Sequence, residues 1–549
     1  MGESEKQEIH GDAQIQAGRA ARLKRCMKWY DGFALAMSVP ALLLYSLGSE
    51  AAVLGVGSIV VWCISMAIAV PLIFGYAELA GLFPTKTGGM GVFQYLAWRN
   101  SDIAKNHPMA IDAIGVVGVW GYWWAWSPVL AIGGLIVGHW FQFIFPQLPQ
   151  AFWMQVLIGA LFLGLMYLIN YFGIAGGAKM GWILTACCII PLFVLTVLPF
   201  VEGKIIWSNF VPFLPLDYRF QFNYSLGLPP VYCTSWFTWP AIYGIIGGLF
   251  IAAWSTYGYE AAAVYTAEYA NPRRDTALAI GVATIFVAFF FILLPIVAIG
   301  VDGIQGIQAD YLLAIPKIGI TLFGNIGGYV TMFAMMAGIL LALNQATNGG
   351  GRALYQMAED GLLLKQFAAV NKYKVPSVAM GYDVIFNVFL MSIGSPIAIY
   401  SASAVGYLIV NVLANRSISY MRSKFPNANR PFKVWRGMWP FTKYLWIVNG
   451  ILLIGAPVFG GYLGTLLGVT VCIIVVCIYL YRHKVQDKPG YRIFGEHLLP
   501  DYLRGTPDAK GKINKTLDRY GFTLLIISIY AIIFIFAYLA NTIGLFYPT

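Results

Sequence analysis

Charged residues are scarce in this chain and occupy only 11% of its 549 positions, whereas hydrophobic residues occupy 59%. Ordinary globular proteins are roughly a quarter charged, so this composition argues against a soluble domain. Charge is missing altogether from the longest apolar stretches, which are 51–77, 113–178, 180–201, 220–259, 318–351, 384–415, 444–481 and 520–549. A membrane-spanning helix needs about 20 apolar residues, so each stretch can hold one or two such helices. Strand-like alternation in units of about ten residues is also missing, which argues against an outer-membrane barrel.

Cysteine and histidine are also few, at seven and five residues. Only Cys233 falls in a predicted external loop, so an extracellular disulfide would lack its second cysteine. The histidines are scattered along the chain, at His10, His107, His139, His483 and His497. No metal-ligand spacing, nucleophile elbow or phosphate-binding loop stands in a suitable context. We therefore predict no enzymatic activity, no metal ion and no cofactor.

The basic residues that are present alternate along the chain. Thirty-two of the 35 lysines and arginines fall in every second gap between apolar segments, and the other gaps share only Lys204, Arg219 and Lys317. Cytoplasmic loops of membrane proteins retain basic residues, so this alternation predicts a multi-pass protein of the cell membrane with a cytoplasmic N-terminus. The net charge of +11 then predicts contact with anionic membrane lipid, not with nucleic acid.

Twelve membrane-spanning helices are predicted, at 32–54, 57–81, 112–142, 152–172, 180–201, 243–268, 277–300, 322–348, 376–394, 398–416, 443–461 and 464–481. We refer to them as spans one to twelve. Residues 1–30 would form a cytoplasmic tail and 203–242 an external loop, whereas 483–549 would begin with a cytoplasmic segment. In that last region the uncharged run 520–546 predicts a thirteenth helix across the membrane. The alternative for this run is a helix lying along the bundle or the membrane surface.

Spans one and six are interrupted in a way that ordinary membrane helices are not. Pro40 in span one cannot donate a backbone hydrogen bond, and it disfavours helix at Val39. Span six contains the polar, glycine-bearing stretch 254–260. The two spans are equivalent if 31–202 and 243–421 are two five-helix repeats, followed by two more helices in 422–482. A matched pair of interrupted helices predicts a transporter site at the membrane midplane, and a pair of plain kinks is the alternative.

Four motifs stand in order along the chain. The first is Glu78-Leu79-Ala80 with Phe83-Pro84-Thr85 and Gly88-Gly89, and the second is 254–260 with Ala267-Glu268 and 271–275. The third is Arg352-Ala353-Leu354-Tyr355 with 359–363, and the fourth is Arg430-Pro431-Phe432-Lys433-Val434. With these motifs the chain resembles the amino acid–polyamine–organocation transporter superfamily over roughly residues 30–482. The resemblance implies an all-α, LeuT-like bundle of 5+5 inverted repeats with two further helices. It also implies a permease that moves amino acids or related amines by alternating access.

The chain departs from that superfamily in spans one and five. Ser38-Val39-Pro40-Ala41 replaces the usual glycine-rich pattern of span one, and 185–191 in span five lacks the lysine that many members carry. Sodium coupling would need side-chain oxygens from span eight, which is mostly apolar between Thr331 and Thr347. We expect Glu260 to be the only carboxylate deep in a span. Keeping it charged there is costly, so Glu260 is predicted to carry the coupling proton, with a purely structural carboxylate as the alternative.

The hypothesis for the substrate site follows from the two breaks. Backbone N–H groups of the half-helix after Pro40, near Ala41 and Leu42, would bind the substrate carboxylate at the positive end of the helix dipole. Backbone carbonyls near Trp254 would meet its ammonium group, and the Trp254 ring would close over its side chain. The other predicted binding residues are Ser38, Trp123, Ser255, Tyr257 and Gly258.

Charged residues near the cytoplasmic ends of the spans are predicted to act in a gate or in the fold. Glu78, Glu268 and Arg352 are the main candidates. We expect the acidic members, with Asp275, to pair with Arg273, Arg274 or Arg352. Two alternatives to a proton-coupled permease stay open at this point, an exchanger without ion coupling and a transporter-like receptor or scaffold. The oligomeric state and the identity of the substrate are not predicted.

Overall fold

Helices make up the regular structure of the residues that the structure describes. The computed structural model describes residues 27–37, 39, 42–83, 89–172, 174–221, 228–265, 269–428, 430, 433–488 and 535. Its α-helices are α2 (Trp29–Ala36), α3 (Leu43–Leu54), α4 (Gly57–Leu82), α5 (Gly89–Arg99), α6 (Asp102–Asn106), α7 (Pro108–Trp126), α8 (Val129–Ile144), α9 (Phe152–Tyr171), α10 (Ile174–Val201), α11 (Trp239–Thr256), α12 (Pro272–Ala309), α13 (Ala314–Glu359), α14 (Ser377–Met391), α15 (Pro396–Lys424), α16 (Trp439–Leu452) and α17 (Pro457–Tyr481). Short helical turns connect them at η2 (Trp207–Phe210), η3 (Tyr218–Phe220), η5 (Gly258–Tyr265), η6 (Tyr311–Leu313), η7 (Lys365–Ala368), η8 (Leu453–Gly455) and η9 (Arg482–Gln486).

The twelve predicted spans are all helical in the structure. Ten helical segments among the described residues are long and apolar enough to cross a membrane, and the shorter apolar helices α3 and α14 supply the first and ninth spans. The predicted all-α membrane bundle is therefore confirmed. The run 520–546 lies outside the described residues apart from residue 535, so the thirteenth helix stays a prediction. The division of the first ten spans into two repeats also stays a prediction.

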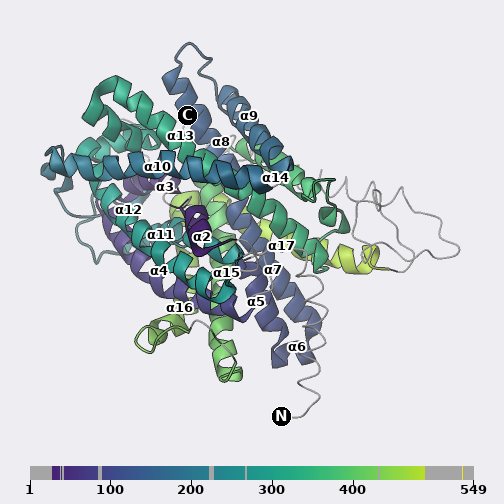
Figure 1. The fold of residues 1–549 in the computed structure, drawn as a ribbon. Coiled ribbons are helices and arrows are strands. Elements are labelled where there is room, and N and C mark those ends of the chain that lie inside the picture. Colours follow the sequence, from purple (N-terminus) through teal and green to yellow (C-terminus); the bar gives the residue numbers. More distant parts are fainter. Residues whose placement is uncertain are drawn as a thin grey trace.

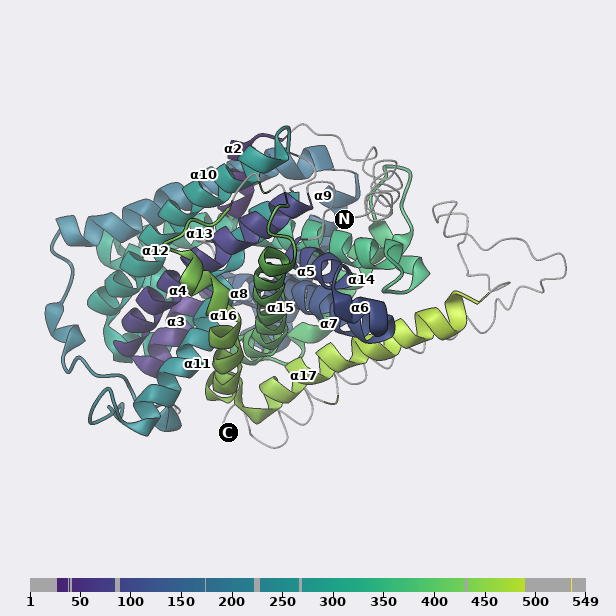
Figure 2. The same ribbon diagram turned by 90° about the horizontal axis from the view of Figure 1, so that it is seen from below.

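The long helices pack into one bundle. In Figure 1 the short helix α2 overlaps the middle of the bundle, but Figure 2 shows that α2 lies at its edge, beside α10. Figure 2 also shows α10 and α17 on opposite sides of the bundle. Helix α10 packs mainly against α13, and α17 packs mainly against α15. Of the two halves of span one, α3 is buried at nearly every position, whereas α2 is only partly covered.

Both predicted interruptions are present. Span one consists of two helices, because α2 ends at Ala36 and α3 begins at Leu43. Span six ends its α-helix at Thr256 and, after Tyr257, continues as the 3₁₀-helix η5. A 3₁₀-helix is wound more tightly than an α-helix and has poorer hydrogen-bond geometry, so the second half of span six is not a simple continuation of the first.

Backbone contacts hold the ends of the two broken spans. Ala270, beyond the end of η5, donates its N–H to the carbonyl of Met27 at 2.7 Å, and Met27 and Tyr269 form an isolated β-bridge beside α2. At the other end of span one, Leu216 donates its N–H to the carbonyl of Leu54 at 3.0 Å. The predicted cytoplasmic end of span one is therefore tied to span six, and its predicted external end is tied to the loop at 203–242.

Candidate substrate site

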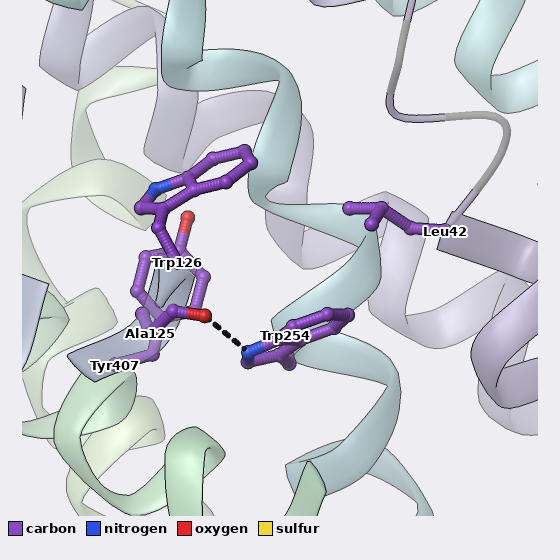
Figure 3. Close-up of a pocket in the computed structure, with 5 residues that line it drawn as sticks. All are labelled: Leu42, Ala125, Trp126, Trp254 and Tyr407. Carbon is purple, nitrogen blue, oxygen red and sulfur yellow. Dashed lines mark hydrogen bonds between the residues drawn. The ribbon is translucent and has the colours of Figure 1, made fainter. Parts of the chain in front are cut away.

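A small pocket lies at the level of the two breaks. Four elements meet there, because the lining residues are Leu42, Ala125, Trp126, Trp254 and Tyr407 (Figure 3). They come from the start of α3, the last turn of α7, the last turn of α11 and the middle of α15. The lining is apolar and aromatic and contains no charged side chain among the described residues. Polar groups of a ligand would have to be met by backbone groups, by the Tyr407 hydroxyl or by indole N–H groups.

The Trp254 ring is held in place as one wall of this pocket. Its indole N–H donates to the backbone carbonyl of Ala125 at 3.0 Å, the bond drawn in Figure 3. The ring also meets Tyr400 edge-on, with 4.5 Å between the ring centroids. These contacts place Trp254 at the pocket, as expected from the sequence, and connect it to α7 and α15.

Gly258 lies directly behind the pocket, where a larger residue would not fit without movement. A Cβ at this position would come within 3.1 Å of the Leu42 side chain and 3.7 Å of the Trp126 ring. Both of those residues line the pocket. The absence of a side chain at Gly258 therefore keeps the two broken spans close together beside the pocket.

The other predicted binding residues are placed differently. Ser38, Pro40 and Ala41 lie outside the described residues. Trp123 is turned toward α14, where its ring lies 5.4 Å from that of Phe386, and Trp126 takes the position at the pocket instead. With 3.6 residues per turn, side chains three positions apart differ by about 60° in direction, so Trp123 and Trp126 can meet different neighbours.

The hydroxyl of Ser255 connects helices and does not line the pocket. It lies 2.9 Å from the Ser46 hydroxyl of α3 and 2.8 Å from the Tyr400 hydroxyl of α15. We call Ser46, Ser255 and Tyr400 the hydroxyl seam. Tyr257, also predicted to bind substrate, is fully buried, with its ring 6.3 Å from that of Tyr407. Ser255 and Tyr257 therefore belong to the surroundings of the pocket.

Glu260 is fully buried in η5, next to one of the pocket residues. The Tyr407 hydroxyl donates to Oε1 of Glu260 at 3.4 Å, and Tyr407 itself lines the pocket. The Tyr122 hydroxyl of α7 lies beside the same carboxylate. One tyrosine side chain thus connects the predicted proton site to the pocket.

Two further carboxylates are fully buried in the spans, so the expectation that Glu260 is the only one is wrong. Asp383 on α14 accepts a hydrogen bond from the Ser127 hydroxyl, and the Asn387 amide donates to the same hydroxyl at 2.8 Å. Glu50 on α3 is also fully buried. Glu50 directly precedes the uncharged stretch 51–77 and Asp383 directly precedes 384–415, so neither lies inside one of these stretches. A helix continues past both residues, and neighbouring helices cover them.

Glu78 forms the ion network of the predicted cytoplasmic side, but with other partners than expected. Arg422 on α15 donates to its Oε1 at 2.7 Å, Arg430 approaches the same oxygen at 3.1 Å, and the N–H of Val434 donates to Oε2 at 2.9 Å. The predicted pairing of Glu78 with Arg273, Arg274 or Arg352 is therefore wrong. The network joins span two to span ten and to the segment before span eleven.

The remaining gate candidates lie elsewhere. Asp275 accepts a hydrogen bond from the N–H of Asn271 at 3.0 Å, so it stabilises the start of α12. Its expected pairing with an arginine stays a prediction, because the side chain of Arg273 lies outside the described part of the structure. Arg352 is half-buried on α13, and Glu268 lies outside the described residues. Among the residues searched, no group of three or more His, Cys, Asp or Glu side chains could hold a metal ion.

Comparisons with known proteins agree with this architecture. The chain is 23% identical to the gamma-aminobutyric acid permease of Bacillus subtilis over 44% of its own length and 55% of that protein. It is 25% identical to a vacuolar cationic amino acid transporter of Arabidopsis thaliana over 27% of its length and 25% of that protein. It is 23% identical to an uncharacterized amino acid permease of Bacillus subtilis, over 64% of its length and 73% of that protein. The chain thus spans only about half, or less, of the first two relatives.

A family profile covers more of the chain than these pairwise matches do. The profile described as "Amino acid permease" matches residues 27–460, from the start of α2 to the first turn of α17. That range contains both broken spans, the pocket and Glu260. The chain therefore belongs to the amino acid permease family.

Proposed function

We propose that this protein carries an amino acid or a related amine across the cell membrane by alternating access, with transport coupled to protons. The observation that supports this most directly is the position of Tyr407, which lines the pocket and donates a hydrogen bond to Glu260. A change in the protonation of Glu260 alters the acceptor of that bond. It can therefore alter the shape of the pocket, and a bound substrate can alter the proton affinity of Glu260 in return.

The start of α3 and the Trp126 indole support binding of a carboxylate. Leu42, the N-cap of α3, forms no side-chain cap, and its own N–H donates to the Val39 carbonyl at 2.8 Å, so a carboxylate here would be attracted mainly by the positive end of the helix dipole. Trp126 lines the same pocket, and its indole N–H has no hydrogen-bond partner among the described residues. The ammonium group would lie at the last-turn carbonyls of α11, where the helix dipole is negative. The apolar lining would then contact the substrate's side chain.

The names of the relatives support the same substrate class. Those with assigned substrates are named for gamma-aminobutyric acid, cationic amino acids and lysine, which all combine a carboxylate with an amine. A carboxylate site at α3 and an ammonium site at α11 would suit that shared chemistry. The orientation inferred from the basic residues places the N-terminus in the cytoplasm, with α3 in the outer half of the membrane and η5 in the inner half.

Reconstitution into liposomes tests this proposal. The purified protein should take up a labelled amino acid from a panel covering neutral, acidic and basic side chains and 4-aminobutyrate, and an inward proton gradient should raise the accumulation above the external concentration. Replacing sodium by choline should leave this accumulation of the labelled amino acid unchanged. Uptake that requires sodium would contradict proton coupling. Exchange of internal for external substrate with no response to either gradient would favour the uncoupled exchanger, and an absence of transport with retained binding would favour a receptor.

A further inference from the structure

Glu50 is a buried carboxylate whose role is not explained by the pocket. It lies on α3, its side chain is fully buried, and a Cβ added to Gly248 of α11 would come within 3.2 Å of its Oε2. The same added Cβ would also meet the side chains of Leu54 and Val61, at 2.6 and 2.8 Å. The Glu50 carboxylate therefore points into an apolar interface between α3, α4 and α11.

Neither oxygen of Glu50 has a hydrogen-bond partner among the described residues. The backbone of Ala252 on α11 comes near the carboxylate but forms no hydrogen bond with it. None of the ion pairs formed by the described residues includes Glu50. Burying an ionised carboxylate without a partner costs far more free energy than a folded protein can spare, so Glu50 is neutral in this conformation and carries a proton.

The hydroxyl seam closes the outer half of the bundle next to Glu50. Ser46 lies one turn before Glu50 on α3, and its hydroxyl meets that of Ser255 on α11. The Tyr400 hydroxyl of α15 joins this seam and donates to the backbone carbonyl of Ile251 at 3.0 Å. A path from the outer side to the pocket requires α3 and α11 to separate from α15. That separation would break the seam and admit water toward Glu50, where the carboxylate could then ionise.

Few other groups could respond to pH at this position. Among the described residues, the titratable group that interacts electrostatically with Glu50 from a neighbouring helix is the Tyr400 phenol of α15. Gly248 and Ala252 of α11 lie beside the carboxylate, and Val61 of α4 lies on the other side of Gly248; none of these three residues can titrate. A phenol in this surrounding stays neutral at any physiological pH, so a pH response of the seam would come from Glu50.

We propose that Glu50 is a second proton-binding site, and that the outer half of the bundle closes only when the Glu50 carboxylate has taken up a proton from the external solution. The ionised form would keep the seam open, because closing it would bury an unpaired charge. This inference rests on the proposed alternating-access function but not on Glu260. In this proposal Glu50 binds the proton that arrives from the external solution, and Glu260 binds or releases a proton beside the substrate pocket.

Accessibility of the seam to a water-soluble reagent tests this without any transport measurement. Ser46→Cys places a thiol in the seam, and Cys233→Ser removes the cysteine of the predicted external loop. In proteoliposomes, a membrane-impermeant maleimide should label the Ser46→Cys thiol faster as external pH rises. Part of that rise comes from formation of the thiolate, so each rate is divided by the rate for a free cysteine at the same pH. The corrected rate should still rise, by up to about tenfold per pH unit, the limit for one titrating group. Adding Glu50→Gln, which resembles the protonated form, should remove the pH dependence of the corrected rate and keep labelling slow throughout.

Three controls make the outcome decisive. Glu202→Gln changes an exposed carboxylate after α10 and should leave the pH dependence of labelling intact. Glu260→Gln should also leave it intact, so that failure of the proton-coupling proposal and failure of this one can be told apart. Glu50→Asp keeps a titrating group and should retain a pH dependence, which shows that a loss in the Gln variant is not caused by misfolding. The proposal would be overturned if the Glu50→Gln variant were still labelled with the wild-type pH dependence.

Infrared difference spectra show directly whether the Glu50 carboxyl group carries a proton. Spectra of the wild-type protein recorded at acidic and alkaline pH should contain a carbonyl band of a protonated carboxyl group that is missing from Glu50→Gln and present in Glu260→Gln. If that band is absent, and labelling of the Ser46→Cys thiol is instead slowed at constant pH by a basic amino acid but not by a neutral one, Glu50 binds a substrate ammonium group and the proton assignment is wrong.

Discussion

Glu50 and Glu260 occupy comparable places and differ in their surroundings. Each lies on the half-helix that follows the break in its span, and each is fully buried. Glu260 accepts a hydrogen bond from Tyr407 and lies beside Tyr122, whereas neither oxygen of Glu50 has a partner among the described residues. Hydroxyl donors can accommodate an ionised or a protonated carboxyl group without a change of fold, but an apolar interface accommodates only the neutral form.

This difference separates two roles that burial alone would not distinguish. A carboxylate that tolerates both forms suits a site that titrates while the bundle is closed around a substrate. A carboxylate that is tolerated only in its protonated form suits a site that titrates only when the bundle opens. Asp383 gives a third case, because its Oδ1 accepts hydrogen bonds from Ser127 at the end of α7 and from Asn387 of α14, whereas its Oδ2 has no partner among the described residues. We expect Asp383 to hold these two helices together and not to titrate during the cycle.

The largest effect is expected from Gly258→Leu. This variant tests whether the pocket beside Glu260 is the substrate site, on which the comparison of Glu50 with Glu260 depends. The added side chain would collide with Leu42 and Trp126, so uptake should be abolished while the protein remains folded. Initial uptake rates and size-exclusion profiles measure the two properties. Gly450→Leu is the matched control, since a Cβ at that position on α16 meets nothing within 4 Å. Normal uptake by the Gly258 variant would place the site elsewhere.

Glu260→Gln should remove the pH dependence of uptake between about pH 5 and 7.5, the range that a buried carboxyl group can reach. The amide keeps the size of the side chain but cannot bind or release a proton, so equilibrium binding of substrate should change little. Uptake rates across that range, together with binding measured by isothermal titration, provide the test. Glu202→Gln serves as the exposed control. A variant that retains the full pH profile would leave Glu260 as a structural carboxylate.

Trp126→Phe should weaken substrate binding by roughly fivefold to tenfold, as expected for the loss of one hydrogen-bond donor worth about 1–1.5 kcal/mol. The phenyl ring retains most of the apolar lining. Trp123→Phe on the same helix is the matched control, because that ring packs against Phe386 away from the pocket, and its affinity should stay within about twofold. Competition binding distinguishes the two. If Trp123→Phe weakened substrate binding more than Trp126→Phe did, Trp123 would be the binding residue of span three.

Tyr407→Phe should have the smallest effect on binding and a selective effect on coupling. It removes the hydroxyl that reaches Glu260 and preserves the ring at the pocket, so accumulation driven by a proton gradient should fall by about fivefold, the equivalent of one hydrogen bond of about 1 kcal/mol. Exchange at equal pH on both sides should change less. Measurement of both activities on one preparation gives the ratio. An equal loss in both would mean that Tyr407 contributes to binding but does not connect the two sites.

Elements with strong local signals were predictable from the sequence. Uncharged runs of sufficient length placed the twelve spans, and Pro40 and the polar stretch 254–260 located the two breaks. Trp254 and Gly258 could be assigned to the site because they lie within the second break. Glu260 could be singled out because a carboxylate in an apolar run is unusual. The side-chain directions of Trp123, Trp126 and Ser255 could not be read this way, since they depend on which helix packs against each face.

The sequence by itself determined that this chain is a multi-pass helical protein with two interrupted spans, because hydrophobic length and backbone chemistry act locally and leave a pattern in the residue order. The tertiary structure decided which groups meet. It joined Glu78 to Arg422, more than three hundred residues away, placed Tyr407 between the pocket and Glu260, and left Glu50 without a partner in the part of the chain that it describes. Such contacts depend on how distant helices pack, and residue spacing does not encode the packing of helices that are far apart in the chain.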